Sequence, residues 1–409
     1  MGDPDRRTFV AQTAGALAAM ALLPEFAFAA PVARGAPRRL ALIGCGRHGR
    51  LILDELQKID AVAVAAICDT VPARVQAGLE RAVGAVGFAD HRALLDAGSG
   101  IEAVVVATPT HLHRAIVEDS LAAGMHVFCE APLAATAADA RAIAAAANAS
   151  DRIFQGGLYA RSNPLYQRAW SLMRSDSVRD VVSLYGQNNR KTSWRFPAPD
   201  RALERATNWR LDADVSIGLP GELGTHQFDV ANWFRGRAPS RVSGFGAIRL
   251  HDDGRDVADT VSIALQWDDN VVMQYQATLA NSHGGVFEVV HGTNAALRLA
   301  GTHAWMFKEA DAATQGWEVY ATRQQFQGED GIVLAADATQ LAAQGRLDAG
   351  AGLEHPPLFY ALADFVRSIA EEAAVACTAD DALQSTLVGI AAHEAVARGT
   401  TVEIASRSS

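Results

Sequence analysis

The sequence predicts a two-domain α/β protein, in which a parallel sheet with crossover helices precedes an α+β domain with a mostly antiparallel sheet. Two observations support this prediction. Residues 38–157 alternate short apolar runs with helical patterns, as successive βα units do. Over residues 158–404, runs with apolar side chains at every second position follow one another, as in antiparallel strands with one buried face. The length of 409 residues suits such an arrangement, at about 150 residues for each domain.

Six strands are expected in the first domain, each followed by a helical or turn-forming segment. The Val-rich fourth run is suited to burial on both faces, as in the centre of a parallel sheet. An alanine-rich helix is expected over Thr136–Asn148. The strands are predicted at Arg39–Ile43, Val62–Cys68, Val86–Phe88, Glu102–Ala107, Met125–Cys129 and from Arg152–Gln155 onward.

The second domain combines helices with alternating strands. A long loop over Arg190–Asp214 separates its first strand from the helix at Glu222–Arg235, and loops of that length tend to be functional. Residues 314–353 are polar and are expected to be irregular surface. Further helices are predicted at Pro164–Arg174, Pro357–Glu372 and Thr378–Arg398, and strands at Asp180–Asn188, Arg241–Leu250, Ala258–Trp267, Val271–Ala280, Gly285–Val290, Leu297–Leu299 and Val402–Ile404.

A glycine-rich turn follows the first predicted strand. Gly44 permits a tight turn, Gly46 lets a pyrophosphate approach the backbone, and Gly49 lets the next helix pack closely on its strand. The helix that begins near Arg47 and His48 offers free N–H groups to phosphates. These features predict a dinucleotide-binding, or Rossmann, domain.

Asp69 completes the dinucleotide-binding pattern. It closes the second strand, twenty residues after Gly49, where a carboxylate can accept hydrogen bonds from both ribose hydroxyls. A carboxylate in that place would repel a 2′-phosphate. We therefore expect NAD as the cofactor, with NADP less favoured.

Polar residues also follow the fourth and fifth strands of the predicted sheet. Ligands of such sheets lie at the carboxyl ends of the strands, so these residues are expected to line the same crevice. An alternative for the two histidines is that they only begin a helix and contact no ligand. The residues are Thr108, Pro109, His111 and His113 after the fourth strand, and Glu130 and Ala131 after the fifth.

Glu222, His226 and Asp229 fall on one predicted helix at intervals of four and three residues, which places them on one face. An imidazole flanked by carboxylates has a fixed tautomer and a raised pKa, which suits proton transfer. The alternative is a polar helix face with no chemical role. One histidine and two acids at these intervals do not resemble a zinc site, and no metal is expected.

The composition excludes several classes of protein. The net charge is −10, with 46 acidic residues against 36 Lys and Arg, which argues against a nucleic-acid partner. A hydrophobic fraction of 49% and a charged fraction of 20% are typical of a globular protein with a large core. The four cysteines show no Cys-x-x-Cys spacing, so neither a metal site nor a structural disulfide is expected.

The first thirty residues are interpreted as a twin-arginine export signal. Arg6 and Arg7 precede the apolar stretch Ala14–Leu23, and Ala27-Phe28-Ala29 offers a cleavage site. The alternative is a membrane anchor, but the apolar run is short for a span of about 30 Å, and no membrane insertion is expected after signal removal. We expect a periplasmic or otherwise exported protein that leaves the cytoplasm folded, with its cofactor.

Several segments together resemble the Gfo/Idh/MocA oxidoreductase family. The resemblance covers most of residues 38–404 and includes the glycine-rich turn, Asp69, residues 107–113, Cys129–Leu133 and Glu222–Asp229. It implies hydride transfer between NAD(P) and a sugar, inositol or other polyol, and an open sheet in the second domain that supports a homodimer or homotetramer. It also implies that His226 is the catalytic base and that Glu222 holds the position of its usual Asp partner.

Ala131 departs from the family pattern, which usually has a lysine there that bridges the cofactor ribose and the reacting hydroxyl. His226, polarised by Glu222, could serve as the sole base, with Glu130 and His113 near the nicotinamide. Otherwise Tyr159, Arg161 or Lys191 could supply the missing group.

Two other functions remain open at this stage. The lysine is also missing from the family's NAD-dependent, redox-neutral glycosidases, which often carry a twin-arginine signal, and a nucleotide-binding protein without turnover is the third possibility. For a carbohydrate substrate, Trp209 and Asp229 are the further candidate contacts, Trp209 because it is an aromatic residue close in sequence to the His226 helix.

Overall fold

A computed structural model describes residues 36–404, except for residues 99, 199, 316–317, 319–320, 327 and 336–351. The expected export signal at residues 1–30 therefore lies outside the described residues. Within the described part, no helix is both long and apolar enough to cross a lipid bilayer.

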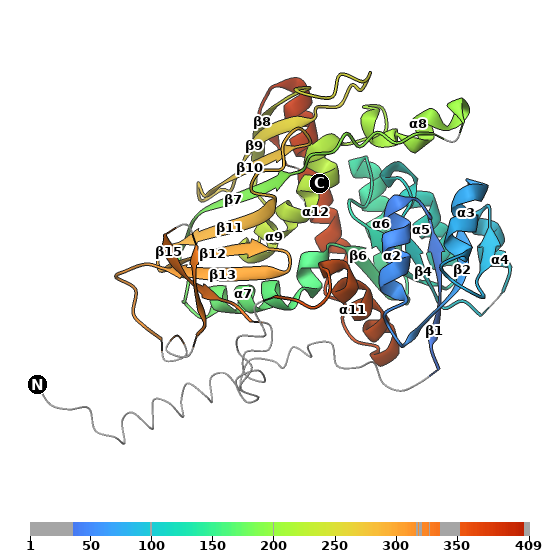
Figure 1. The fold of residues 1–409 in the computed structure, drawn as a ribbon, viewed down its shortest axis with the longest axis horizontal. Helices are drawn as coiled ribbons and strands as arrows, with labels where there is room; N and C mark the ends of the chain where they lie inside the picture. Colours follow the sequence, from blue (N-terminus) through green and yellow to red (C-terminus); the bar gives the residue numbers. More distant parts are fainter. Residues whose placement is uncertain are drawn as a thin grey trace, which may run out of the picture.

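The first domain is built on a six-stranded sheet with the order β3-β2-β1-β4-β5-β6, and all its strands are parallel (Figure 1). This is the doubly wound order in which ligands bind at the carboxyl ends of the strands. All four residues of β4 are buried, as its Val-rich sequence predicts. The strands are β1 (Arg38–Ile43), β2 (Val62–Cys68), β3 (Val86–Phe88), β4 (Ala103–Val106), β5 (His126–Glu130) and β6 (Phe154–Gly157).

Helices cover both faces of this sheet. Side-chain caps explain where two of them begin. Asp90 accepts hydrogen bonds from the first backbone N–H groups of α4, and the Thr136 side chain accepts one from Asp139 at the start of α6. The helices are α2 (Arg47–Leu56), α3 (Pro72–Leu79), α4 (His91–Asp96), α5 (His113–Ala122) and α6 (Ala137–Ala149).

The second domain contains a ten-stranded sheet with the order β14-β15-β13-β12-β11-β7-β10-β9-β8-β16. Only β7 and β10 are paired in parallel, so the predicted mostly antiparallel sheet, and with it the predicted fold class, is confirmed. The strands are β7 (Val181–Asn189), β8 (Arg241–Ala247), β9 (Thr260–Gln266), β10 (Val272–Thr278), β11 (Val286–Gly292), β12 (Ala295–Ala300), β13 (His303–Lys308), β14 (Arg323–Phe326), β15 (Glu329–Val333) and β16 (Val402–Glu403).

Strands β14 and β15 fall in the segment that the sequence predicts as irregular surface. They form a hairpin at the edge of the sheet, and the ladder joins polar residues such as Gln324 and Gln325 to Gly331 and Asp330. Backbone hydrogen bonds hold this pair together, and its side chains are largely polar. The sequence therefore lacks the apolar alternation by which a half-buried strand is predicted. β13 likewise has no counterpart among the predicted strands.

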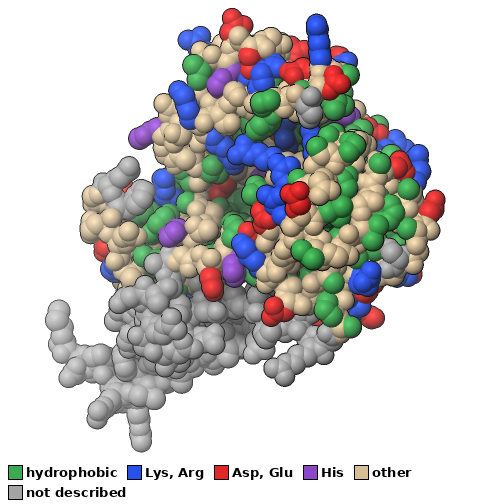
Figure 2. Space-filling model, turned by 45° about the vertical axis from the view of Figure 1, so that its right-hand side comes forward, with side chains coloured by type: hydrophobic (Ala, Val, Ile, Leu, Met, Phe, Trp, Pro, Cys, Tyr) green, Lys and Arg blue, Asp and Glu red, His purple; other side chains and the backbone are tan. Residues whose placement is uncertain are grey.

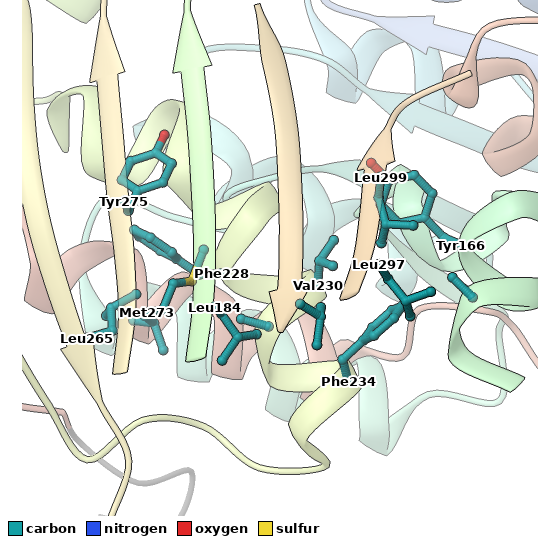
Figure 3. Close-up of a cluster of buried hydrophobic side chains, with 14 of the residues drawn as sticks. Tyr166, Leu184, Phe228, Val230, Phe234, Leu265, Met273, Tyr275, Leu297 and Leu299 are labelled. Atoms are coloured by element: carbon teal, nitrogen blue, oxygen red, sulfur yellow. The ribbon is translucent and has the colours of Figure 1, made fainter. Parts of the chain in front are cut away.

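The core of the second domain lies between this sheet and its helices α7 (Pro164–Arg174), α9 (Thr225–Arg235) and α12 (Ala379–Arg398). Figure 3 shows side chains of the sheet meeting those of α7 and α9 in this layer. Phe228 of α9 packs edge-on against Tyr275 of β10, with ring centroids 4.9 Å apart. Both side chains are almost fully buried.

Two C-terminal helices join the domains. Although α11 (Pro357–Glu371) belongs by sequence to the second half, it packs against the first sheet, where Phe365 lies edge-on to Phe128 of β5 at 5.7 Å. Figure 1 shows α11 beside α2. The next helix, α12, contacts α6 of the first domain and α9 of the second. Through these contacts, α11 and α12 hold the first sheet and α9 of the second domain next to each other.

Candidate active site

The glycine-rich turn has the shape that a dinucleotide needs. Gly44 has a φ of +99°, and a Cβ there would lie 2.6 Å from the Ala107 carbonyl group. A Cβ on Gly49 would lie 1.9 Å from the Gly44 oxygen, so α2 can approach its strand only with glycine at this place. A Cβ on Gly46 would meet nothing within 4 Å. The space beside Gly46 and the first N–H groups of α2 therefore form an open cradle that fits a pyrophosphate.

Asp69 lies next to this cradle, at the end of β2. One carboxylate oxygen accepts a hydrogen bond from the backbone N–H of Cys45 at 2.9 Å, and the other accepts one from Val71 at 2.9 Å. The Arg74 guanidinium is 3.9 Å away. Each carboxylate oxygen keeps a second lone pair, so the fixed Asp69 side chain can still accept from a ribose hydroxyl.

A cluster of Glu130, Tyr159 and His48 lies at the carboxyl end of β5. The Tyr159 hydroxyl donates to Glu130 Oε2 at 2.5 Å, and His48 Nε2 is 2.9 Å from the Tyr159 oxygen and 3.3 Å from Glu130 Oε1. Burial, the largest single influence, lowers the pKa of His48, but the charge of Glu130 and its hydrogen bond together outweigh burial, and the pKa is raised. Burial and the Glu130 charge raise the pKa of Tyr159 well above its usual value, so the phenol keeps its proton.

Tyr159 is a protic group that hydrogen-bonds Glu130, the residue directly before Ala131. Its ring lies 5.4 Å from the His226 ring, measured between centroids. Of the three residues considered as substitutes for the missing lysine, Tyr159 is the one that the structure brings to Glu130. Lys191 is exposed and pairs through its backbone with Ala280.

His226 lies in the first turn of α9 and is half-buried. Burial lowers its pKa to about 4, while the Glu130 charge opposes this shift and the charges of His48 and Arg190 add to it. The expectation of a raised pKa is therefore wrong. At neutral pH His226 is an uncharged imidazole that can accept a proton.

The predicted partnership between Glu222 and His226 is also absent from the structure. Glu222 lies in a π-helical turn, Pro220–Gly224, where the wider turn takes it off the face that an α-helical spacing assumes. Its buried carboxylate accepts hydrogen bonds from Thr110 Oγ1 at 3.1 Å and from Arg210 Nε at 3.2 Å. Glu222 thus connects the two domains at the cleft.

Arg161 and Asp229 form a buried pair. Arg161 donates to both Asp229 oxygens at 2.9–3.0 Å, and Ser385 of α12 donates to the same carboxylate at 2.8 Å. The Asp229 side chain has no exposed surface, which rules out a direct contact with a substrate. These two residues were expected at the substrate, and the structure instead gives them a supporting place behind the site.

The two histidines after β4 have different surroundings. His113 is buried, with its ring nitrogens 3.1 Å from the Leu133 carbonyl and 3.0 Å from the Thr108 carbonyl, so it ties together the loops that carry residues 108–110 and 130–133. His111 lies in the short helix Thr110–Leu112, which begins after Pro109. It is half-buried and packs edge-on against Trp209 at 5.8 Å.

The segment predicted as a long loop carries three short helices, Arg201–Leu203, α8 (Glu204–Thr207) and Trp209–Leu211. Arg210 lies over the Trp209 ring at 4.5 Å and over the Trp194 ring at 5.8 Å. Phe196 of the same segment packs under the Arg47 guanidinium at 5.4 Å. The segment therefore reaches across from the second domain to the start of α2.

Sequence reasoning missed three features of the site: the His48–Glu130 pair, the Thr110–Glu222 bond and the position of Arg190 near His226. The first two join residues that are far apart in the chain, and only the rule that strand ends meet could have suggested them. The described residues contain no group of three or more side chains able to hold a metal ion, and all four cysteines are buried and unpaired.

A doubly wound domain with a dinucleotide cradle, joined to a sheet domain that supplies an imidazole, defines a two-domain dehydrogenase-like protein. Residues 38–158 match the profile described as the oxidoreductase family, NAD-binding Rossmann fold, and residues 189–404 match that of the family's C-terminal alpha/beta domain. The chain therefore belongs to the Gfo/Idh/MocA oxidoreductase family, and its first domain is the family's NAD-binding domain.

Two individual relatives share at most about a third of their aligned residues with this chain. Inositol 2-dehydrogenase of Pseudarthrobacter chlorophenolicus is 32% identical over 206 residues, which are 50% of this chain and 56% of that protein. The uncharacterized oxidoreductase YrbE of Bacillus subtilis is 23% identical over 248 residues, or 60% of this chain and 67% of that protein. The match to the first of these thus spans little more than half of its length.

Solved structures show the same fold. Levoglucosan dehydrogenase in complex with NADH and levoglucosan aligns with a TM-score of 0.71 and 20% identity, over 90% of this chain and 100% of that one. An oxidoreductase domain protein from Kribbella flavida aligns with a TM-score of 0.72 and 20% identity, over 91% of this chain and 100% of that one.

Proposed function

We propose that this protein is an NAD-dependent oxidoreductase that oxidises or reduces a CH–OH group of a sugar, polyol or related carbohydrate. One observation carries the proposal: the uncharged His226 lies beside Tyr159, which Glu130 and His48 hold at the carboxyl ends of the first sheet. These ends adjoin the Gly46 cradle of the NAD-binding domain. Asp69 favours NAD over NADP, because its carboxylate would repel a 2′-phosphate.

When bound at the Gly46 cradle, NAD would supply the hydride chemistry, and side chains of this protein would accept and donate the proton. His226 accepts the proton of the reacting hydroxyl through a ring nitrogen, because its neutral form dominates at neutral pH. Tyr159 keeps its own proton and can donate it, or pass one on, from a position that Glu130 and His48 fix. Trp209 is buried between His111 and Arg210, so it holds the Arg210 guanidinium in place rather than offering its own ring to a sugar.

The test uses the purified full-length protein. The nucleotide released on denaturation is identified, and NADH formation is followed with a panel of free sugars and inositols. His226→Asn should abolish turnover while nucleotide binding stays intact. Equal loss of both would show that His226 is structural and would contradict the assignment.

Ala131 favours one second candidate, a redox-neutral glycosidase, because the position lacks the lysine usual in the family's dehydrogenases. Tyr159 would then manage a proton during elimination of the aglycone. Release of an aglycone from a nitrophenyl glycoside without net NADH would select this activity. Net NADH from a free sugar would select the dehydrogenase.

We also propose export by the twin-arginine route and assembly into a homodimer or homotetramer. The first rests on Arg6 and Arg7 before the apolar run, and the second on the family's open sheet. Cell fractionation of the wild-type protein and of an Arg6→Lys, Arg7→Lys variant tests export. Light scattering on the purified protein tests the assembly.

A further inference from the structure

Arg190 is a cation close to His226 that has no matching anion among the described residues. Glu130 faces His48, and Glu222 faces Arg210, so these acids are paired. Arg190 follows directly after β7, and within the described part of the chain no carboxylate lies at ion-pair distance from it. The paired groups leave the cleft with the positive charge of Arg190 uncompensated.

Arg190 is exposed as a residue, although partial burial of its guanidinium lowers the pKa of that group. Its Nε donates to Asn188 Oδ1 at 2.9 Å, which fixes the plane of the group. No other hydrogen bond of its side chain is found among the described residues, so the two terminal nitrogens are available to a ligand. Such a fork matches the two oxygens of a carboxylate.

Arg190 also lies close to the proposed reaction centre. Burial is the main cause of the lowered pKa of His226, and the charge of Arg190 lowers it further. The backbone N–H of Arg190 donates to the Thr278 carbonyl at 2.8 Å, which ties the residue to the end of β10, the parallel neighbour of β7. A group bound to Arg190 would therefore lie next to a substrate at His226.

A second sign of a missing polar partner comes from Tyr275 of β10. Its side chain is buried, and its hydroxyl has no hydrogen-bond partner among the described residues. Figure 3 shows this hydroxyl turned away from the hydrophobic cluster, toward the carboxyl ends of β7 and β10. Glu288 of β11, whose charge acts on Tyr275, accepts a hydrogen bond from Tyr166 at 2.6 Å, and burial raises its pKa to about 7. Glu288 is therefore only partly ionised at neutral pH, and its carboxylate already accepts the Tyr166 hydroxyl.

The surface agrees with this charge balance. Figure 2 shows Lys and Arg side chains gathered along a hollow in the face of the molecule that is turned to the viewer. The protein as a whole carries a net charge of −10. A local excess of positive charge on an acidic protein attracts an anionic ligand to that place.

We propose that the substrate is an acidic carbohydrate, a sugar or polyol bearing a carboxylate, and that its carboxylate binds the terminal nitrogens of Arg190 while the reacting hydroxyl faces His226. The inference rests on the proposed function and adds the substrate class to it. One guanidinium suits a singly charged, planar carboxylate better than a phosphate, which carries more charge and three oxygens to satisfy.

Binding is measured by calorimetry on the full-length, NADH-loaded protein with two matched pairs, D-glucuronate with D-glucose and D-galacturonate with D-galactose. At least one uronate should bind about tenfold or more tightly than its neutral partner, the effect of one charged hydrogen-bonded contact. Arg190→Gln should remove this preference. Arg39→Gln is the control, because Arg39 is an exposed cation on β1, at the opposite end of the strand from the cradle, and it should leave the preference unchanged.

Several outcomes overturn the inference: no preference in either pair, a preference that survives in Arg190→Gln, or tighter binding of D-glucose 6-phosphate than of the uronates. NADH formation in the same samples, loaded with NAD, separates the two proposals. Oxidation of neutral sugars without uronate preference leaves the proposed function standing and removes the substrate class. Uronate binding that depends on Arg190, without any NADH formed, keeps the anion site and removes the proposed function.

Discussion

At the scale of single residues, the site consists of titratable side chains, and the protonation of each depends on burial and on the charges of its neighbours. Glu130 is buried, and burial would raise its pKa, yet His48 and the Tyr159 hydroxyl hold that pKa below its usual value. The carboxylate is therefore charged, the phenol protonated and the His226 imidazole neutral. This distribution gives the site one proton acceptor and one proton donor side by side.

Tyr159→Phe tests the donor. The variant keeps the ring contact with His226 but leaves Glu130 Oε2 without its 2.5 Å hydrogen bond. We expect kcat to fall about 10²-fold or more, the range of a lost general acid or base, with the affinity for NADH little changed. Stopped-flow turnover and fluorescence titration with NADH measure the two quantities. Unchanged kcat would exclude Tyr159 from the chemistry.

The pH profile tests the acceptor. Because the pKa of His226 is lowered to about 4, the proton-accepting form persists as the pH falls below the usual histidine value of 6.5 and is lost only near pH 4. The acid limb of kcat/KM for oxidation should therefore lie near pH 4. A limb near pH 6.5 would show that a different group accepts the proton or that His226 is better solvated than in the structure.

At the scale of elements, the turn between β1 and α2 and the π-helical turn before α9 place the chemistry. The first turn brings N–H groups to the cradle. The second directs Glu222 toward Thr110 and Arg210 and leaves His226 to face Tyr159. Both turns span only a few residues, yet they determine where the N–H groups of α2 and the side chain of Glu222 point.

The two glycines of the first turn should respond differently to the same substitution. Gly46→Ala adds a methyl group that meets nothing, so the unfolding free energy should stay within about 0.5 kcal/mol while NADH affinity falls, because the methyl group fills the cradle. Gly49→Ala forces a contact with the Gly44 oxygen and should cost about 2 kcal/mol as well as NADH affinity. Urea unfolding without nucleotide and NADH titration separate the two effects. Equal stability losses would contradict the geometry.

The sequence allowed the strands of the first domain, the glycine-rich turn and the antiparallel character of the second sheet to be predicted, because each depends on local periodicity or backbone freedom. The partners of Glu222 could not be predicted in the same way. A spacing of four residues implies a shared face only in a regular α-helix, and the π-helical turn at Pro220–Gly224 breaks that assumption. The Glu130–Tyr159 bond joins residues 29 positions apart and needs the fold itself.

At the scale of the whole molecule, the two domains are joined by buried polar contacts as well as by helices. Within the second domain, Arg161 after β6 pairs with Asp229 of α9, and Ser385 of α12 donates to the same carboxylate. This network anchors α12, which also packs against α6 of the first domain. Thr110 and Glu222 add a direct bond across the cleft. The halves of the site should therefore keep their relative positions when no ligand is present.

Asp229→Asn tests this joint. The variant leaves the Arg161 cation buried without its partner, and the loss of one member of a buried pair costs about 3 kcal/mol. We expect a lower urea midpoint and, because the pair anchors α12, which packs against both domains, a single transition that moves as a whole. Asp151→Asn, at an exposed carboxylate paired with the neighbouring Arg152, serves as the comparison and should change little. A stability loss of similar size in both variants would refute the structural role.

The contact between Phe196 and Arg47 has a consequence for the lifetime of the complex. It brings the segment after β7 to the start of α2, where the cradle begins. A dinucleotide seated there would be bordered by both halves of the molecule, and it could depart only after an aromatic side chain and a guanidinium had separated. Slow release of this kind would let one nucleotide serve through many cycles, with its oxidation state restored in place by the next substrate.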